Sequence, residues 1–79
     1  MANALSTFQI DAALRRLARS QLGLVTIAQA EAAGIDRWAL ERRREAGALA
    51  PMFAEVMRLT VTPCTPEQQI LGAALAVPE

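Results

Sequence analysis

Four residues in one predicted helix, at about residues 37–46, carry the side chains best suited to contact nucleic acid. At about 100° per residue, Trp38, Glu41 and Arg42 fall on the outer side of that helix, and Arg37 lies beside them in its first turn. An arginine can donate two hydrogen bonds to guanine O6 and N7, or bind a phosphate. A tryptophan can contact a sugar or a thymine methyl group. The pattern is therefore typical of a helix that enters the major groove.

The same charges also fit a solvated helix face. In that interpretation Glu41 pairs with Arg37 and Glu45 with Arg42. The two acids would also repel phosphate. Both interpretations remain open from the sequence.

Trp38 has three interpretations of its own. It could contact DNA, or it could contact a protein partner, because tryptophan is enriched at protein interfaces. Alternatively, it packs within the chain against Phe8, Phe53 or the hairpin that follows the helix.

Other polar residues are weaker candidates. Arg58 could contact a phosphate from a hairpin strand. Thr26 and Gln29 begin a predicted helix whose free amides could hold a phosphate, although their capping role explains them equally well. The first predicted helix carries a basic strip that we expect to be solvated, formed by Arg15, Arg16 and Arg19.

Composition excludes several kinds of site. The chain has 79 residues, a formal net charge of zero, no histidine and one cysteine, Cys64. A His-containing zinc site, a Ser–His pair and an internal disulfide are therefore unavailable. We expect no catalytic residue, no metal ion and no cofactor. No apolar run approaches the length that spans a bilayer, and no signal peptide begins the chain, so we expect a cytoplasmic protein without a membrane partner.

Glycine, proline and capping residues divide the chain into elements that position these side chains. The pattern predicts a first helix over Thr7–Gln21, begun by Ser6 or Thr7. It predicts a short second helix over Ile27–Ala33 with a capping box at Thr26. Two short helices joined by a glycine-containing turn are typical of a helix-turn-helix, here at about residues 26–47.

The remaining elements complete a larger pattern. Residues 48–61 favour a β-hairpin, with its turn near Phe53–Glu55, and residues 66–77 favour a last helix begun by Thr65. The order predicts a mainly α chain of about four helices with a short hairpin wing. We therefore expect residues 1–79 to form a single winged helix-turn-helix domain.

Several segments of the chain resemble the N-terminal domain of AbiEi-type antitoxins. They are Leu17–Gln21, Gly23–Thr26, Ala28–Ala30, Ala33–Ile35 and Asp36–Leu40. The resemblance extends over about residues 14–77, and residues 23–47 carry most of it. It implies a winged-helix module of a regulator or antitoxin, often followed by a larger domain.

The wing departs from that family's pattern. Members usually carry an arginine and an aromatic residue after the third helix, then a His-Pro-Gly-Val-Tyr-Arg-like wing. This chain has Ala48 and Leu49 instead, and it keeps only Val56 and Arg58 of the wing pattern. Because most of the basic residues are lost, we expect weak, salt-dependent binding to double-stranded DNA. The alternative is a protein-interaction or dimerisation module that has lost DNA binding.

Apolar periodicity also predicts the core. Arg44 is expected beside Leu40 on the inner side of the third helix. The last helix is apolar on more than one side, so Leu75 and Val77 should form an exposed patch for a second copy or a covering C-terminal domain. Seven residues are expected to be buried: Leu14, Leu17, Val25, Ile35, Leu40, Leu59 and Leu71.

Overall fold

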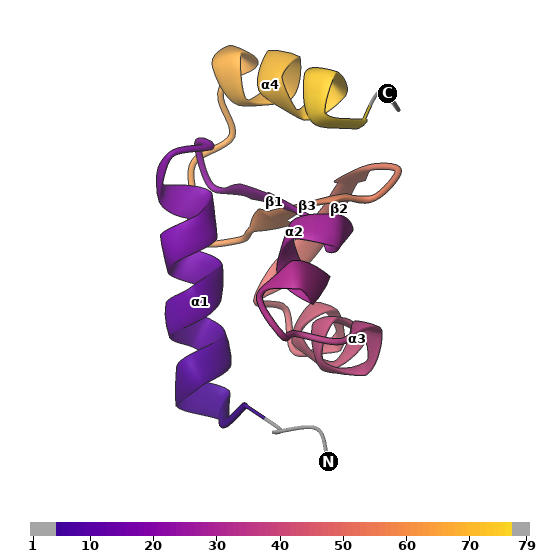
Figure 1. The fold of residues 1–79 in the computed structure, drawn as a ribbon. Helices are drawn as coiled ribbons and strands as arrows, with labels where there is room; N and C mark the ends of the chain where they lie inside the picture. Colours follow the sequence, from indigo (N-terminus) through magenta and orange to yellow (C-terminus); the bar gives the residue numbers. More distant parts are fainter. Residues whose placement is uncertain (1–4, 77–79) are drawn as a thin grey trace.

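The computed structural model describes residues 5–76, which form four helices and one antiparallel sheet (Figure 1). The prediction of a mainly helical chain with four helices and a hairpin is confirmed for these residues. The elements follow in the predicted order: α1 (Thr7–Arg19), β1 (Leu24–Thr26), α2 (Ile27–Ala32), α3 (Arg37–Glu45), β2 (Leu49–Phe53), β3 (Val56–Leu59) and α4 (Pro66–Ala76).

The sheet has three strands in the order β1-β3-β2, so the last strand lies between the other two. Val25 pairs with Met57 on one side, and Leu49 pairs with Leu59 on the other. The predicted hairpin is therefore present. Its turn contains no glycine, and Glu55 takes the left-handed conformation instead, with φ of 65°.

Side-chain caps fix where all four helices begin, and the predicted cap of α4 is present because Thr65 Oγ1 accepts from the amide of Gln68 at 3.1 Å. Ser6 forms a capping box with Gln9, and Thr26 forms the predicted capping box with Gln29. Asp36 accepts a hydrogen bond that caps α3. These caps satisfy backbone amides that have no partner within the helix.

A tight turn joins α2 to α3. Gly34 has φ of 94°, a conformation that glycine adopts at little cost. The amide of Gly34 donates to the carbonyl of Glu31 at 3.0 Å, and the amide of Ile35 donates to that of Ala30 at 2.9 Å. These two hydrogen bonds end α2 and direct the buried Ile35 into the core. The turn therefore sets the relative orientation of the two helices.

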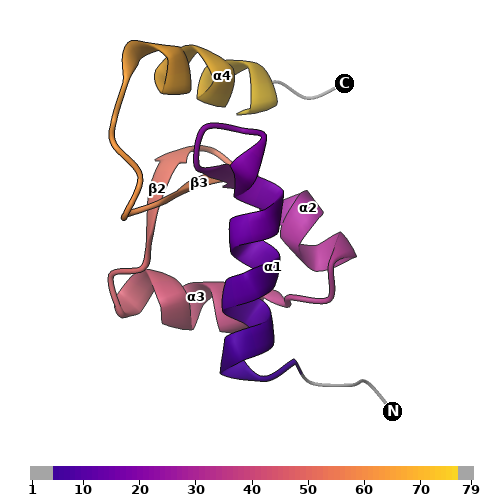
Figure 2. The ribbon, with the colours of Figure 1, turned by 90° about the vertical axis from the view of Figure 1, so that its left-hand side faces the viewer.

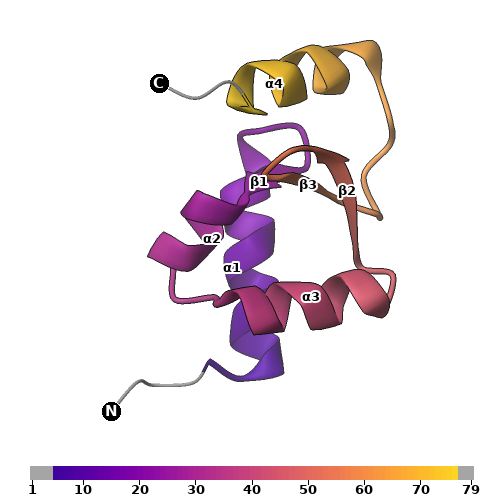
Figure 3. The ribbon, with the colours of Figure 1, turned by 90° about the vertical axis from the view of Figure 1, so that its right-hand side faces the viewer.

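The sheet lies between α4 and α3 in all three views, and α1 runs alongside α2 and β1 (Figures 2 and 3). The core lies among α1, α2, α3 and the sheet. It contains small and aliphatic residues: Ala13, Leu14, Ala18, Val25, Ala30, Ile35, Leu40, Leu49 and Met57. Burial of Leu14, Val25, Ile35 and Leu40 is thus confirmed.

The prediction of burial was wrong for the other three leucines. Leu17, Leu59 and Leu71 are each only partly buried. The buried residues of α4 are instead Gln68 and Gly72. Nε2 of Gln68 donates to the carbonyl of Leu22 at 2.8 Å, and the Oε1 atom of this buried side chain has no hydrogen-bond partner in the described structure.

Gly72 allows α4 to approach the hairpin closely. A Cβ atom at this position would lie 2.8 Å from the sulfur of Met52 and 3.0 Å from the ring of Phe53. On α4, Ile70 has 72% of its surface exposed and Leu75 is partly exposed. Val77, the other residue of the predicted patch, lies outside the described residues. Within residues 5–76, every helix is too short or too polar to cross a bilayer.

Candidate nucleic-acid interface

The helix α3 is held by its inner side and leaves its outer side open. Leu40 is 3% exposed and packs into the core. The predicted outer residues Trp38, Glu41 and Arg42 are all exposed. Trp38 has 72% of its surface exposed, so packing within the described chain does not account for this side chain. The outer face of α3 is therefore available to a partner.

Arg37 is held by two acidic residues from other elements. Its Nε lies 3.3 Å from Oε2 of Glu31 on α2, and its Nη2 lies 3.4 Å from Oε1 of Glu55 in the hairpin turn. The predicted pair between Arg37 and Glu41 is absent from the ion pairs of residues 5–76. Arg37 thus connects α2 to the hairpin.

Glu41 pairs with Arg44 one turn further along α3. The prediction that Arg44 faces inward was wrong, because its side chain is exposed and reaches along the surface to this carboxylate. The hydrogen bond from Arg44 lowers the pKa of Glu41, and the same bond raises the pKa of Arg44. The two charges therefore largely cancel on the helix surface.

Arg42 remains available for an external anion. It is exposed, and the predicted pair with Glu45 is not among the ion pairs of the described residues. Arg42 and Trp38 lie four residues apart and therefore on the same side of α3. Together they provide one guanidinium and one aromatic surface.

Sequence analysis missed the role of Arg43, which fastens α3 to α1. Its Nη1 lies 2.6 Å from Oδ1 of Asp11, and its Nη2 donates to the carbonyl of Thr7 at 3.0 Å. Only 16% of the Arg43 side chain is exposed. Its position one turn from the buried Leu40 was the available signal, because i and i+3 share a helix face.

The other predicted site residues, Arg58, Thr26 and Gln29, do not belong to α3. Arg58 is on the central strand β3 and donates to the carbonyls of Leu59 and Thr62, bracing the loop that follows. Thr26 and Gln29 bond to each other in the capping box, and Gln29 also bonds to Gln21. Their polar side-chain atoms are thus used within the chain.

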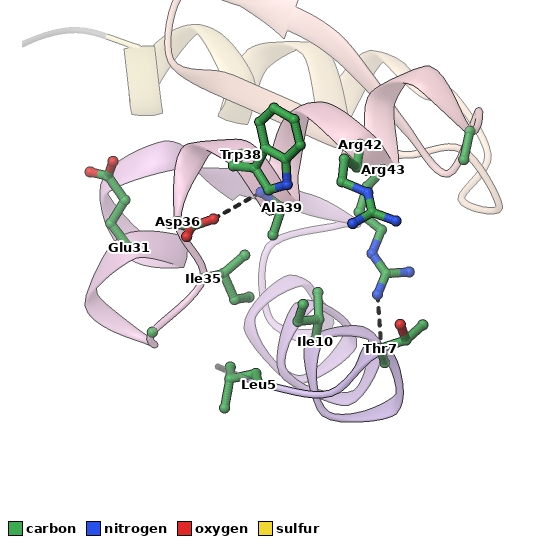
Figure 4. A pocket seen from close by; sticks show the side chains of 12 residues that line it. Leu5, Thr7, Ile10, Glu31, Ile35, Asp36, Trp38, Ala39, Arg42 and Arg43 are labelled. Carbon is green, nitrogen blue, oxygen red and sulfur yellow. Dashed lines mark hydrogen bonds between the residues drawn. The ribbon is translucent and has the colours of Figure 1, made fainter. Parts of the chain in front are cut away.

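Trp38 lies between two hollows of the surface. A groove of about 750 Å³ lies between α3 and the start of α1 (Figure 4), and Leu5, Ile10 and Ala39 contribute to its lining. A smaller hollow of about 380 Å³ is lined by Trp38 together with Ile27 and Met57. The indole therefore forms a ridge on the candidate interface.

Comparison with known proteins identifies the family. The profile of a family described as "Transcriptional regulator, AbiEi antitoxin" matches residues 12–53, which is more than half of the chain. The matched segment runs from α1 to β2 and includes Arg37, Trp38 and Arg42. No curated protein and no solved structure matches the chain. The chain therefore belongs to the family of AbiEi antitoxin transcriptional regulators.

Proposed function

We propose that the chain binds double-stranded DNA as a winged helix-turn-helix, with α3 in the major groove and the β2–β3 hairpin as the wing. The order of elements supports this assignment, because a tight turn joins α2 to α3 and the hairpin follows directly. The observation that carries the proposal is the exposed pair of Trp38 and Arg42 on the outer side of α3. A regulator family is consistent with it.

The two central residues have different tasks in this proposal. Arg42 donates to guanine O6 and N7, which discriminates guanine from the other bases. Trp38 contacts a thymine methyl group or a sugar through its indole.

Arg37 and Glu41 can bind DNA only after each leaves its ion-pair partner within the chain. Arg37 gives up Glu31 or Glu55 to reach a phosphate, and Glu41 leaves Arg44 to accept from a base. Because each exchange loses an existing ion pair, these residues add less affinity than Arg42.

Three further residues support the interface from its margins. Arg58 would reach a phosphate by leaving the carbonyl of Thr62. Thr26 and Gln29 fix the start of α2 through the capping box, and their contact with phosphate would compete with that role.

Few phosphates can be neutralised by such a surface. With two to four contacts, log affinity should fall against log salt with a slope of roughly −2 to −4, since each phosphate contributes about −0.9. Binding by one copy should therefore be weak at physiological salt. A second copy or a covering domain would be needed for tight binding.

A titration of Arg42→Ala against random and selected duplexes tests the proposal. The variant should lose affinity and change its base preference, because a base contact carries sequence information. Arg16→Ala is the matched control, since Arg16 is an exposed arginine on α1. The control should lower the salt slope by about one at most and keep the same preference. A folded wild-type chain that binds no duplex at low salt refutes the proposal.

A second candidate function is self-association or partner binding through α4. The observation that favours it is the apolar side chain of Ile70 on α4, which is 72% exposed. The first turn of this helix carries one acidic residue, Glu67, and its last turn carries no basic residue. Ile70→Glu should then lower the sedimentation coefficient at high concentration. Val61→Glu is the control, because Val61 is 87% exposed and lies outside α4.

Trp38→Ala distinguishes the two functions. If α3 binds DNA, the variant loses DNA binding and keeps its fold. If the chain instead associates through α4, the variant keeps its association and shows no change toward DNA, because α3 lies on the other side of the sheet.

A further inference from the structure

The groove between α1 and α3 has the volume of a small-molecule site. Its volume of about 750 Å³ lies within the roughly 300–1,000 Å³ typical of ligand sites. Leu5, Ile10 and Ala39 supply apolar surface, and Trp38 lies at its edge (Figure 4). An apolar body would therefore find a complementary surface here.

The charged residues of the lining restrict the chemistry of the ligand. Asp36 accepts the bond that caps α3, and Glu31 is paired with an arginine of that helix. Arg43 is bound to Asp11. Among the charged side chains of the lining, Arg42 is the one that has neither an ion pair nor a hydrogen bond within residues 5–76, because Asp36 accepts the capping bond from the amide of Ala39. The side chain of the groove that still lacks a polar partner is therefore a cation.

We propose that this groove binds a small amphiphilic monoanion, a carboxylate attached to a short apolar body. The carboxylate bonds to the guanidinium of Arg42, and the body lies on Ile10 and Ala39 beside the indole of Trp38. Dispersion contacts and removal of apolar surface from water hold the body. The charged pair selects a carboxylate over a neutral head group.

A regulatory consequence rests on the proposed DNA-binding function. Trp38 and Arg42 line the groove and are also the central residues of the proposed interface. A bound carboxylate would occupy Arg42 and cover the indole. The ligand and DNA should therefore compete for the same two side chains.

Hexanoate is a suitable probe, and NMR of the Trp38 indole N–H is a suitable measurement, because the chain has one tryptophan. Hexanoate should shift this resonance and the amides of Ile10 and Ala39 in a saturable way. Acetate lacks the apolar body and hexan-1-ol lacks the charge, so both should bind more weakly. We expect about two- to fivefold between hexanoate and hexan-1-ol, the range of an exposed ion pair.

Arg42→Gln tests the assigned head-group contact. It should reduce the affinity for hexanoate to that for hexan-1-ol and leave hexan-1-ol unchanged. Arg16→Gln, which removes an exposed arginine of α1, should keep the preference for hexanoate. The proposal is overturned if hexanoate gives no saturable shift, or if Arg42→Gln keeps the wild-type preference.

A DNA titration with and without hexanoate tests the competition separately. Saturating hexanoate should lower the affinity of the wild-type chain for duplex DNA, and the same competition in Arg42→Gln should need about two- to fivefold more hexanoate. Unchanged wild-type affinity refutes the competition and leaves the binding site established by the NMR shifts. A chain that binds hexanoate but no duplex at low salt supports the site and refutes the DNA-binding function.

Discussion

Asp11 and Arg43 form an ion pair between α1 and α3, and we expect loss of Asp11 to destabilise the fold more than loss of Arg43. Arg43 is 16% exposed, whereas the side chain of Asp11 is 39% exposed. Asp11→Ala leaves a largely buried guanidinium with only the carbonyl of Thr7 as partner. We expect a loss of about 1–2 kcal/mol, below the value for a fully buried charge because Asp11 is partly hydrated. Arg43→Met leaves a carboxylate that water can reach, and should cost less than about 1 kcal/mol.

Urea unfolding of the two single variants and the double variant measures this asymmetry. The double variant should be more stable than Asp11→Ala alone, because it removes the unpaired cation. Arg16→Met, on the exposed side of α1, is the control and should change stability by no more than about 0.5 kcal/mol. Additive losses in the double variant would refute the reasoning, because they would mean that the two residues stabilise the fold independently.

Three other changes test the packing and the charges. Leu40→Ala should cost about 2–5 kcal/mol in thermal or urea unfolding, as for other large-to-small changes in a core, and a loss below about 1 kcal/mol would contradict its burial. Gly23→Ala should cost about 2–4 kcal/mol, because φ is +87° and the new Cβ would lie 2.3 Å from Oγ1 of Thr62; adding Thr62→Gly should recover the steric part, and no recovery would contradict the contact. Arg44→Ala should raise the pKa of Glu41 toward its ordinary 4.5 in a carboxyl NMR titration. Because the pKa is lowered in the folded chain, the stabilisation by this pair is present above the ordinary pKa and is lost as pH falls through the lowered one; an unchanged pKa in the variant would contradict the pairing.

Local signals predicted the framework of α2 and α3 correctly. Thr26 and Gln29 form a capping box because the two bonds join residues three apart in the chain. Gly34 and Asp36 mark the end of one helix and the start of the next for the same reason. Such features depend on backbone geometry within a few residues, and distant parts of the fold have little influence on them.

The partners of the arginines could not be predicted in this way. Arg37 meets Glu31 from α2 and Glu55 from the hairpin turn. Arg43 meets Asp11, which is 32 positions away. Helical periodicity gives the direction of a side chain, but the identity of the opposing element depends on the packing of the whole chain. The nearest acid in sequence was therefore a poor guide.

The contact of α4 with the sheet shows the same limit. The apolar pattern predicted burial of Leu71, but Gln68 and Gly72 are the buried residues of α4. Gly72 is suited to the contact because Met52 and Phe53 leave no room for a side chain. A glycine within a helix carries no apolar signal, so only the position of β2 reveals its use.

The pairing of the arginines on α3 has a consequence for how the helix could recognise DNA. Arg37 joins α3 to α2 and to the hairpin turn, and Arg43 joins it to α1. These bonds reduce the positive charge that would attract phosphate, but they also fix the helix on three sides. A helix held in this way loses less conformational freedom on binding than a mobile one. The proposed interface would then depend on the position of Trp38 and Arg42 more than on net charge. Arg42→Ala should therefore lower the affinity for DNA more than Arg37→Ala does, because Arg37 is held by Glu31 and Glu55.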